Sequence, residues 1–201
     1  MNSRESGLGL TEVLVAVLVF TVGLLGIFGA QVNARKNALE ARQRSIATGL
    51  ARDLLERMRS NPGQLQAFTL DNASPADIAA PVSSACAGAA VTSGGSFGCT
   101  PAELARDDLA EWMQLLGGAV ELVSVVGPEQ STGGLLEPRV CVAVAAGRVS
   151  VAIAWRGLEP LATDPEFACG AGRGWYGADD ELRRALVMHS WIGAPVAGVG
   201  W

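Results

Sequence analysis

A run of apolar residues near the amino terminus dominates the hydrophobic pattern of this chain. Positions 13–32 contain no charged side chain. At about 1.5 Å of rise per residue, a helix over these positions spans about 30 Å, which is the thickness of the hydrocarbon core of a bilayer. The pattern therefore predicts one membrane-spanning helix.

After Val32 the apolar residues recur at spacings of seven or four among charged ones, as on the buried face of an amphipathic helix. The recurring positions are Leu39, Ile46, Leu50, Leu54 and Met58. The sequence SNPG at 60–63 is a strong helix stop. We therefore expect one helix from about Leu8 to Arg59, with a membrane and assembly half over 8–32 and an amphipathic half over 33–60.

Residues 61–201 predict a single globular head. The segment from Gln64 to Pro101 is rich in Ala, Ser, Gly and Pro, and we interpret it as an irregular loop. Thr100, Pro101 and Glu103 then favour the N-cap, the first position and the first turn of a short helix. The apolar side of this helix is formed by Leu104, Leu109, Trp112, Leu115 and Leu116. We expect this side to pack on a sheet.

Four segments of the head have the composition and alternation of β-strands. They are 119–126, 139–146, 148–155 and 184–192. Gly147 joins the middle two tightly, as in a hairpin. The predicted fold class is therefore α+β, with the long amino-terminal helix packed on a carboxy-terminal antiparallel sheet.

Composition supports a membrane segment and argues against one class of partner. Hydrophobic residues make up 49% of the chain and charged residues only 17%, which is a low charged fraction for a soluble protein. The formal net charge is -5. A chain of this charge is poorly suited to holding phosphate backbones, so we expect no nucleic-acid partner.

The four cysteines, Cys86, Cys99, Cys141 and Cys169, lack the paired short spacings of a zinc site. Disulfides suit them better if the head is exported. Cys86 and Cys99 lie 13 positions apart in the irregular segment, where a local bridge would close the loop. Cys169 could reach Cys141 within the sheet, and we favour this pairing among the connectivities that four cysteines permit.

An ionisable residue, Glu12, lies at the start of the apolar run. A carboxylate deep in lipid costs about 2.5–3.5 kcal/mol on insertion scales, so it usually has a partner or a role. If a peptidase cut between Gly7 and Leu8, the new amine of Leu8 could pair with Glu12 of a neighbouring chain. Two other interpretations stay open. Glu12 could be a first-turn carboxylate at headgroup level, or the segment could be a secretory signal cut near 28–30.

The order Gly7, Leu8, Thr11 and Glu12, followed by a long apolar helix, resembles the class III signal of type IV prepilins. The resemblance implies a pilin-like fold and a leader of residues 1–7, which prepilin peptidase removes after Gly7. It also implies methylation of the new amino terminus at Leu8 and a role of Glu12 in assembly.

The sequence DDLAEW at 107–112 resembles the helix before the sheet in type IV pilus modification protein V, a family of minor pilins. The resemblance implies a protein of the bacterial inner membrane with a periplasmic head. It further implies association with other minor pilins and the major pilin, initiation of pilus assembly and a place in the fibre or at its tip. Cell adhesion and twitching motility would then depend on it.

Two rival functions share these features. A minor pseudopilin of a type II secretion system would have the same signal and fold. A periplasmic enzyme or sensor with an uncleaved membrane anchor would have a similar hydrophobic pattern.

No arrangement of residues indicates catalysis or a cofactor, so we expect a protein that is not an enzyme. His189, the only histidine, lies in an apolar strand pattern. The glycine-rich sequence GAGRG at 170–174 lacks the preceding strand and following helix of a phosphate loop. Asp179, Asp180 and Glu181 lack the ligand spacing of an EF-hand, and we interpret them as a solvated turn rather than a calcium site.

Overall fold

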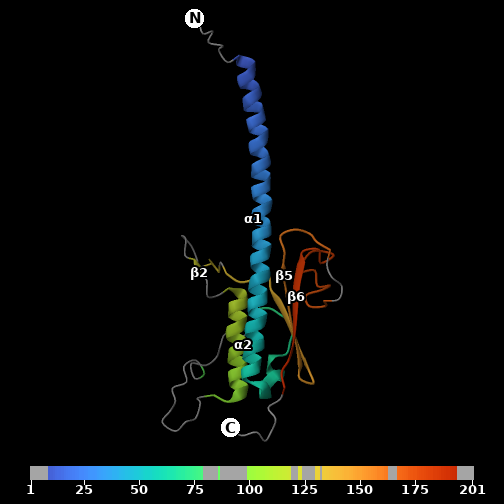
Figure 1. The fold of residues 1–201 in the computed structure, drawn as a ribbon. Helices are drawn as coiled ribbons and strands as arrows, with labels where there is room; N and C mark the ends of the chain where they lie inside the picture. Colours follow the sequence, from blue (N-terminus) through green and yellow to red (C-terminus); the bar gives the residue numbers. More distant parts are fainter. Residues whose placement is uncertain are drawn as a thin grey trace, which may run out of the picture. The chain divides into compact units, whose positions relative to one another are not determined.

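The computed structural model describes residues 9–78, 86, 99–118, 122–123, 130–131, 133–162 and 167–193. The chain divides into two compact units, Met1–Ala41 and Arg42–Trp201. One long helix, α1 (Leu10–Ser60), contributes to both (Figure 1). The predicted single helix is confirmed, although Leu8 lies outside the described residues.

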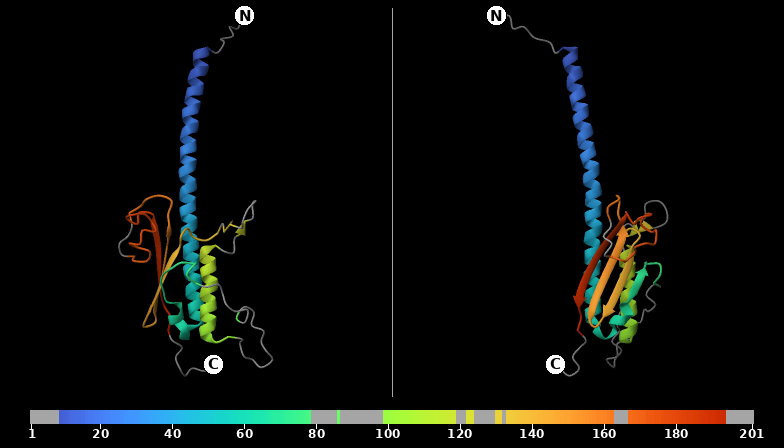
Figure 2. Two further views of the ribbon diagram at one scale, coloured as in Figure 1. Left: turned by 180° about the vertical axis from the view of Figure 1, so that it is seen from behind. Right: turned by 90° about the vertical axis from the view of Figure 1, so that its right-hand side faces the viewer.

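The second unit has three layers, which Figures 1 and 2 show from different sides. Helix α2 (Pro101–Gly117) lies on one side of the 42–60 portion of α1, and a four-stranded antiparallel sheet lies on the other. The strand order is β1-β4-β5-β6. These strands are β1 (Leu70–Ala73), β4 (Arg139–Ala145), β5 (Arg148–Arg156) and β6 (Arg183–Trp191). A short 3-10 helix, η1 (Pro62–Phe68), connects α1 to β1. The α+β fold is therefore confirmed.

The 42–60 portion of α1 forms the centre of the core. Its buried residues are Ala47, Ala51, Leu54, Leu55 and Met58. Adjacent helical residues point about 100° apart, so burial of both Leu54 and Leu55 requires cover on more than one side of the helix. The sheet covers α1 with the inward-facing residues of β5, among them Val149, Val151 and Ile153, all fully buried. The sequence predicted one apolar face for this part of α1. In the structure the helix is instead packed between two layers.

Helix α2 packs on α1, and the prediction that its apolar side packs on the sheet is wrong. Trp112 is fully buried, and its Nε1 donates a hydrogen bond of 2.9 Å to the Leu50 carbonyl of α1. The guanidinium of Arg57, also on α1, lies 3.3 Å from the Asp108 carboxylate and 2.9 Å from that of Glu111. Because α1 is covered on two sides, it separates α2 from the sheet.

Three of the four predicted strands are confirmed as β4, β5 and β6. The described part of the fourth, predicted over 119–126, does not join their sheet. Its described part, β2 (Leu122–Val123), pairs with β3 (Gln130–Ser131) in a separate two-stranded ladder. Strand β1 is instead the fourth member of the main sheet.

The prediction of an irregular loop over Gln64 to Pro101 is wrong at its beginning, where η1 and β1 form, and at Pro101, where α2 begins. Strand β1 pairs with β4 at two positions, Leu70 with Val142 and Ala73 with Val140, and the register shifts between them. Four residues with a shifted register contain too few alternating positions to produce a strand pattern in the sequence.

The β4–β5 hairpin turns at Ala146 and Gly147, as predicted. Both have positive φ, 49° and 81°. This is the combination that a two-residue type I′ hairpin turn requires. Ala145 and Arg148 flank the turn as a register pair. The turn therefore sets the alternation that buries Val140 and Val142 on β4.

Helix α2 begins with the capping box that its sequence predicts. The Thr100 hydroxyl accepts a hydrogen bond from the Glu103 amide (3.3 Å), and the Glu103 carboxylate accepts one from the Thr100 amide (2.7 Å). The bond from the Thr100 amide, followed by that from its hydroxyl, lowers the pKa of Glu103. A lowered folded-state pKa stabilises the fold above the unfolded-state pKa, and this contribution is lost as the pH falls through the folded-state pKa.

Thr100→Ala should lower the free energy of unfolding by about 1 kcal/mol at neutral pH, the typical effect of losing an N-cap side chain. It should also raise the pKa of Glu103 toward its ordinary value. The difference in stability between variant and parent should shrink in acid. Urea unfolding of the full chain in detergent at neutral and acidic pH measures both, and equal stability of the two proteins at neutral pH would contradict the prediction.

Candidate assembly helix and disulfide-bounded loop

The helix of the first unit presents apolar side chains to its surroundings. The large hydrophobic residues from Leu10 to Val32 are exposed, from 37% at Leu24 to 78% at Leu10. The most apolar 18-residue window of α1 has a mean hydropathy of 2.7, and none of it is buried. Among the described residues, α1 is the one helix long and apolar enough to cross a membrane. An apolar surface of this extent needs lipid or other helices around it.

Glu12 lies in the first turn of α1, and its side chain is exposed. Its amide donates a hydrogen bond of 2.9 Å to the Gly9 carbonyl. The side chains that adjoin it on this part of the helix are Val13, Ala16, Val17 and Phe20. The first turn of a helix favours a carboxylate, so the position suits both the headgroup interpretation and the pairing interpretation of Glu12. Gly7 and Leu8, the predicted cleavage and methylation sites, lie outside the described residues.

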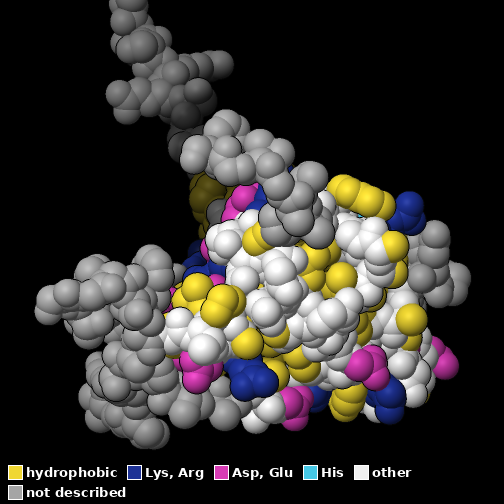
Figure 3. Space-filling model, turned by 90° about the horizontal axis from the view of Figure 1, so that it is seen from below, with side chains coloured by type: hydrophobic (Ala, Val, Ile, Leu, Met, Phe, Trp, Pro, Cys, Tyr) yellow, Lys and Arg dark blue, Asp and Glu magenta, His cyan; other side chains and the backbone are white. Residues whose placement is uncertain are grey.

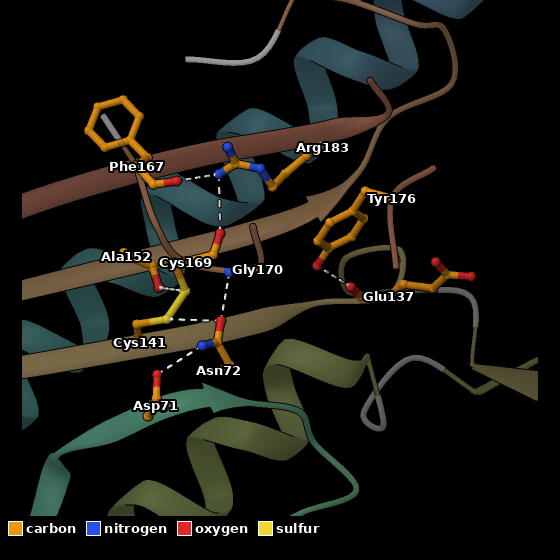
Figure 4. Close-up of a disulfide and its surroundings, with 10 residues drawn as sticks. All are labelled: Asp71, Asn72, Glu137, Cys141, Ala152, Phe167, Cys169, Gly170, Tyr176 and Arg183. Carbon is orange, nitrogen blue, oxygen red and sulfur yellow. Dashed lines mark hydrogen bonds between the residues drawn. A yellow bond between two sulfur atoms is a disulfide. The ribbon is translucent and has the colours of Figure 1, made fainter. Parts of the chain in front are cut away.

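A second candidate region lies in the other unit, on the face of the sheet that points away from α1. Here a disulfide joins Cys141 on β4 to Cys169, 28 positions later, and Cys169 is buried (Figure 4). Another disulfide joins Cys86 to Cys99. These are the two pairs that the sequence favoured. The first holds the described residues 167–183 at the outer face, and we call this segment the disulfide-bounded loop.

A buried arginine anchors the disulfide-bounded loop from β6. The Arg183 side chain is only 3% exposed, and its Nε lies 3.9 Å from a carboxylate oxygen of Asp180. Its Nη1 donates hydrogen bonds to the carbonyls of Phe167 and, at 3.2 Å, Cys169. A buried guanidinium is tolerated where carboxylate and carbonyl oxygens surround it. Arg183 therefore fixes both the start and the end of the loop.

A buried tyrosine anchors the middle of the loop. Tyr176 is fully buried, its hydroxyl donates a 2.8 Å hydrogen bond to the Glu137 carbonyl, and burial raises its pKa. Beside it, the Arg139 guanidinium lies 3.9 Å from the centre of the Trp175 ring, and Arg156 donates a hydrogen bond to the Trp175 carbonyl. Contacts with the strands and with the segment before β4 therefore hold the loop.

Close packing at Gly170 explains one of the glycines in GAGRG. Its φ is 73°, and a Cβ there would lie 2.8 Å from the Tyr176 ring and 3.2 Å from the Ala154 side chain. In composition, the glycine-rich sequence here resembles a phosphate loop, although it lacks the flanking strand and helix. In the structure the glycine instead lets the backbone approach the sheet and the buried tyrosine.

The polar residues that could have held calcium bind the loop backbone. Asp180 accepts a 2.7 Å hydrogen bond from the Gly172 amide, and Glu181 accepts one from the Asp179 amide at 3.1 Å. The part of the chain that the structure describes contains no group of three or more His, Cys, Asp or Glu residues placed to hold a metal ion. His189 lies on β6 and is exposed.

Charges of both signs are scattered over one face of the head. In Figure 3, Lys and Arg side chains lie close to Asp and Glu side chains, with hydrophobic and neutral groups between them. The described surface on this face is therefore not dominated by either charge.

Residues 29–110 match the sequence model of the family described as Tt1218-like: Type IV pilin Tt1218. The matched region extends from the end of the apolar segment through most of α2, and strands β4 to β6 lie beyond it. No curated protein and no solved structure matches the chain. A pilin family suggests a structural role in association with other pilins. The match, the long apolar helix and the antiparallel sheet together support a type IV pilin-like protein that is membrane-anchored and associated with a pilus.

Proposed function

We propose that this chain is a minor type IV pilin that helps to initiate pilus assembly and takes a place at the pilus tip. In this proposal prepilin peptidase cleaves the chain between Gly7 and Leu8 and methylates the new terminus at Leu8. The observation that carries the proposal is an exposed apolar helix with one carboxylate, Glu12, in its first turn.

The apolar surface of the helix favours both membrane anchoring and assembly into a bundle of helices. Its side chains need an apolar environment, and lipid supplies it before assembly. A helix that leaves the bilayer keeps that environment only if it enters a bundle of similar helices. A pilus built around such helices provides this bundle, so the same surface serves as anchor and as subunit interface.

Glu12 can set the alignment of one subunit's helix with that of its neighbour. An ionised carboxylate among apolar groups needs a cationic partner or strong hydrogen-bond donors. Cleavage after Gly7 creates an amine at Leu8, and the amine of one chain can pair with Glu12 of its neighbour. Because the Leu8 amine exists only after cleavage, an unprocessed chain could not supply the partner for Glu12 of its neighbour.

The head is suited to the periplasm and to contacts with other pilins. Its two disulfides form readily in an oxidising compartment. We place the helix in the inner membrane and the head on its periplasmic side before assembly. There the head would contact other minor pilins and the major pilin. Adhesion and twitching motility would depend on this chain through the pili that it initiates.

Mass spectrometry of the amino terminus tests the processing step. The mature protein should begin at Leu8 and carry one added methyl group, and cells without prepilin peptidase should contain only the full-length chain. A mature protein that begins at Met1 would contradict the proposal and favour an uncleaved membrane-anchored enzyme or sensor. A start beyond residue 28 would instead indicate an ordinary secretory signal.

Deletion of the gene separates a pilin from a pseudopilin. Cells that lack this chain should lose surface pili and twitching while they still secrete proteins normally. The opposite result, normal pili with a loss of secretion, would assign the chain to a type II secretion system.

A further inference from the structure

Asn72 contacts both sides of the Cys141–Cys169 disulfide. Its Oδ1 accepts a hydrogen bond of 2.6 Å from the Gly170 amide, and the same oxygen lies 3.5 Å from the Cys141 sulfur (Figure 4). Gly170 directly follows Cys169. One carboxamide on β1 therefore touches one cysteine at its sulfur and the other through the adjacent peptide group.

The backbone of β1 is shaped to bring Asn72 to this place. The register of β1 with β4 shifts between Leu70 and Ala73, and a bulge of this kind re-aims a side chain. Asn72 has a φ of 51°, in the left-handed region where asparagine is enriched among non-glycine residues. Its Nδ2 also donates a 2.8 Å hydrogen bond to Asp71, which orients the carboxamide oxygen toward Gly170. The backbone conformation and the side-chain hydrogen bond of Asn72 thus both direct its Oδ1 toward the Gly170 amide.

We propose that Asn72 is a positioning residue for the Cys141–Cys169 disulfide. Arg183 holds the Cys169 carbonyl from β6, and Asn72 holds the Gly170 amide from β1. The backbone around Cys169 is thereby hydrogen-bonded from two sides, next to β4, which carries Cys141. In the reduced protein the same contacts keep the second thiol near the first, which raises the effective concentration of one for the other.

The chemistry needs an external oxidant, which is a small-molecule or protein disulfide. A cysteine thiolate attacks the oxidant and forms a mixed disulfide, and the first oxidant thiol leaves. The second cysteine thiolate attacks the mixed disulfide at the sulfur of the first cysteine, and the second oxidant thiol leaves. The two cysteines lose two electrons and two protons, and the oxidant gains them. Asn72 exchanges no electrons or protons, because it acts on the geometry of the second, intramolecular step.

Equilibration of the full chain in detergent with glutathione buffers of different redox ratio tests this proposal. Differential alkylation and mass spectrometry then give the oxidised fraction of each cysteine pair. Asn72→Gly removes the carboxamide while leaving positive φ accessible. The effective concentration of one thiol for the other in the Cys141–Cys169 pair should fall about threefold to tenfold. This is the factor expected for one net hydrogen bond. The Cys86–Cys99 pair should be unchanged and serves as a control within the same molecule.

Two further variants separate the side chain from the backbone. Ala146→Gly likewise introduces glycine at a residue of positive φ, 49°, in the β4–β5 turn, and should alter neither pair. The paired exchange Asp71→Asn with Asn72→Asp keeps an acceptor for the Gly170 amide and a donor–acceptor contact between side chains 71 and 72. It should retain more of the effective concentration than Asn72→Gly. The proposal is overturned if Asn72→Gly has no effect, if both pairs weaken equally, or if the paired exchange of residues 71 and 72 weakens the Cys141–Cys169 pair as much as glycine does.

Discussion

Glu12→Ala should leave membrane insertion and cleavage intact while reducing incorporation of the chain into pili by about tenfold or more. A charge-assisted hydrogen bond contributes about 1.5–3 kcal/mol, and each 1.4 kcal/mol corresponds to a factor of ten. Alanine removes the proposed partner of the Leu8 amine without adding bulk, and it makes insertion easier because a carboxylate is lost from the apolar segment. Quantitative immunoblots of sheared pili and of membrane fractions measure incorporation and total protein separately.

Three variants place the effect at the charge. Glu12→Gln keeps the shape of the side chain but only a neutral hydrogen bond, so its incorporation should lie between those of the parent and Glu12→Ala. Val13→Ala, at the next position, should incorporate normally. Gly7→Val should block the earlier step and accumulate full-length precursor. If Glu12 only favours the helix amino terminus, its loss costs about 0.3–1 kcal/mol of helix stability. Normal incorporation of Glu12→Ala would then rule out the pairing.

Trp112→Ala should lower the free energy of unfolding of the head by about 3–5 kcal/mol, the range for removing a buried tryptophan. Trp112 is fully buried on the α1 side of α2, and its indole N–H is bonded to the Leu50 carbonyl. Alanine would leave a cavity between the two helices and remove this link. Urea unfolding of the full chain in detergent, followed by near-ultraviolet circular dichroism, measures the change.

Two comparisons separate packing from hydrogen bonding. Trp112→Phe keeps much of the apolar volume but loses the indole donor, so its cost should be clearly smaller than that of alanine. Trp191→Ala removes a tryptophan that is 67% exposed on β6, and the change in unfolding free energy should stay within about 0.5 kcal/mol. Equal losses for Trp112→Ala and Trp191→Ala would contradict the packing of α2 on α1 through Trp112.

The elements that could be predicted from the sequence are those whose pattern is complete within a few turns or residues. The apolar run and the spacing of Leu50, Leu54 and Met58 predicted α1, since helical periodicity is a local property. Thr100 and Glu103 predicted the start of α2 for the same reason. The position of Glu12 in the first helical turn also followed from local order, whereas its proposed partner belongs to another chain.

The residues that the sequence did not reveal act through distant contacts. Arg183 begins a strand next to another arginine, and nothing in that pattern distinguishes a buried guanidinium from an exposed one. Asn72 lies in a segment that resembles an irregular loop, and its partner, the Gly170 amide, is 98 positions away. A signal for either residue would need knowledge of which strands are neighbours.

The amino-acid order by itself determined the apolar helix with its early carboxylate, the three long strands and the hairpin, because each depends on neighbouring residues. Only the tertiary structure decided that α1 lies between α2 and the sheet, that β1 completes that sheet, and that Asn72 and Arg183 hold the loop around Cys169. The physical reason is that burial and long-range hydrogen bonds are properties of surfaces brought together by folding. Before the rest of the chain has folded, a short segment is compatible with several different partner surfaces.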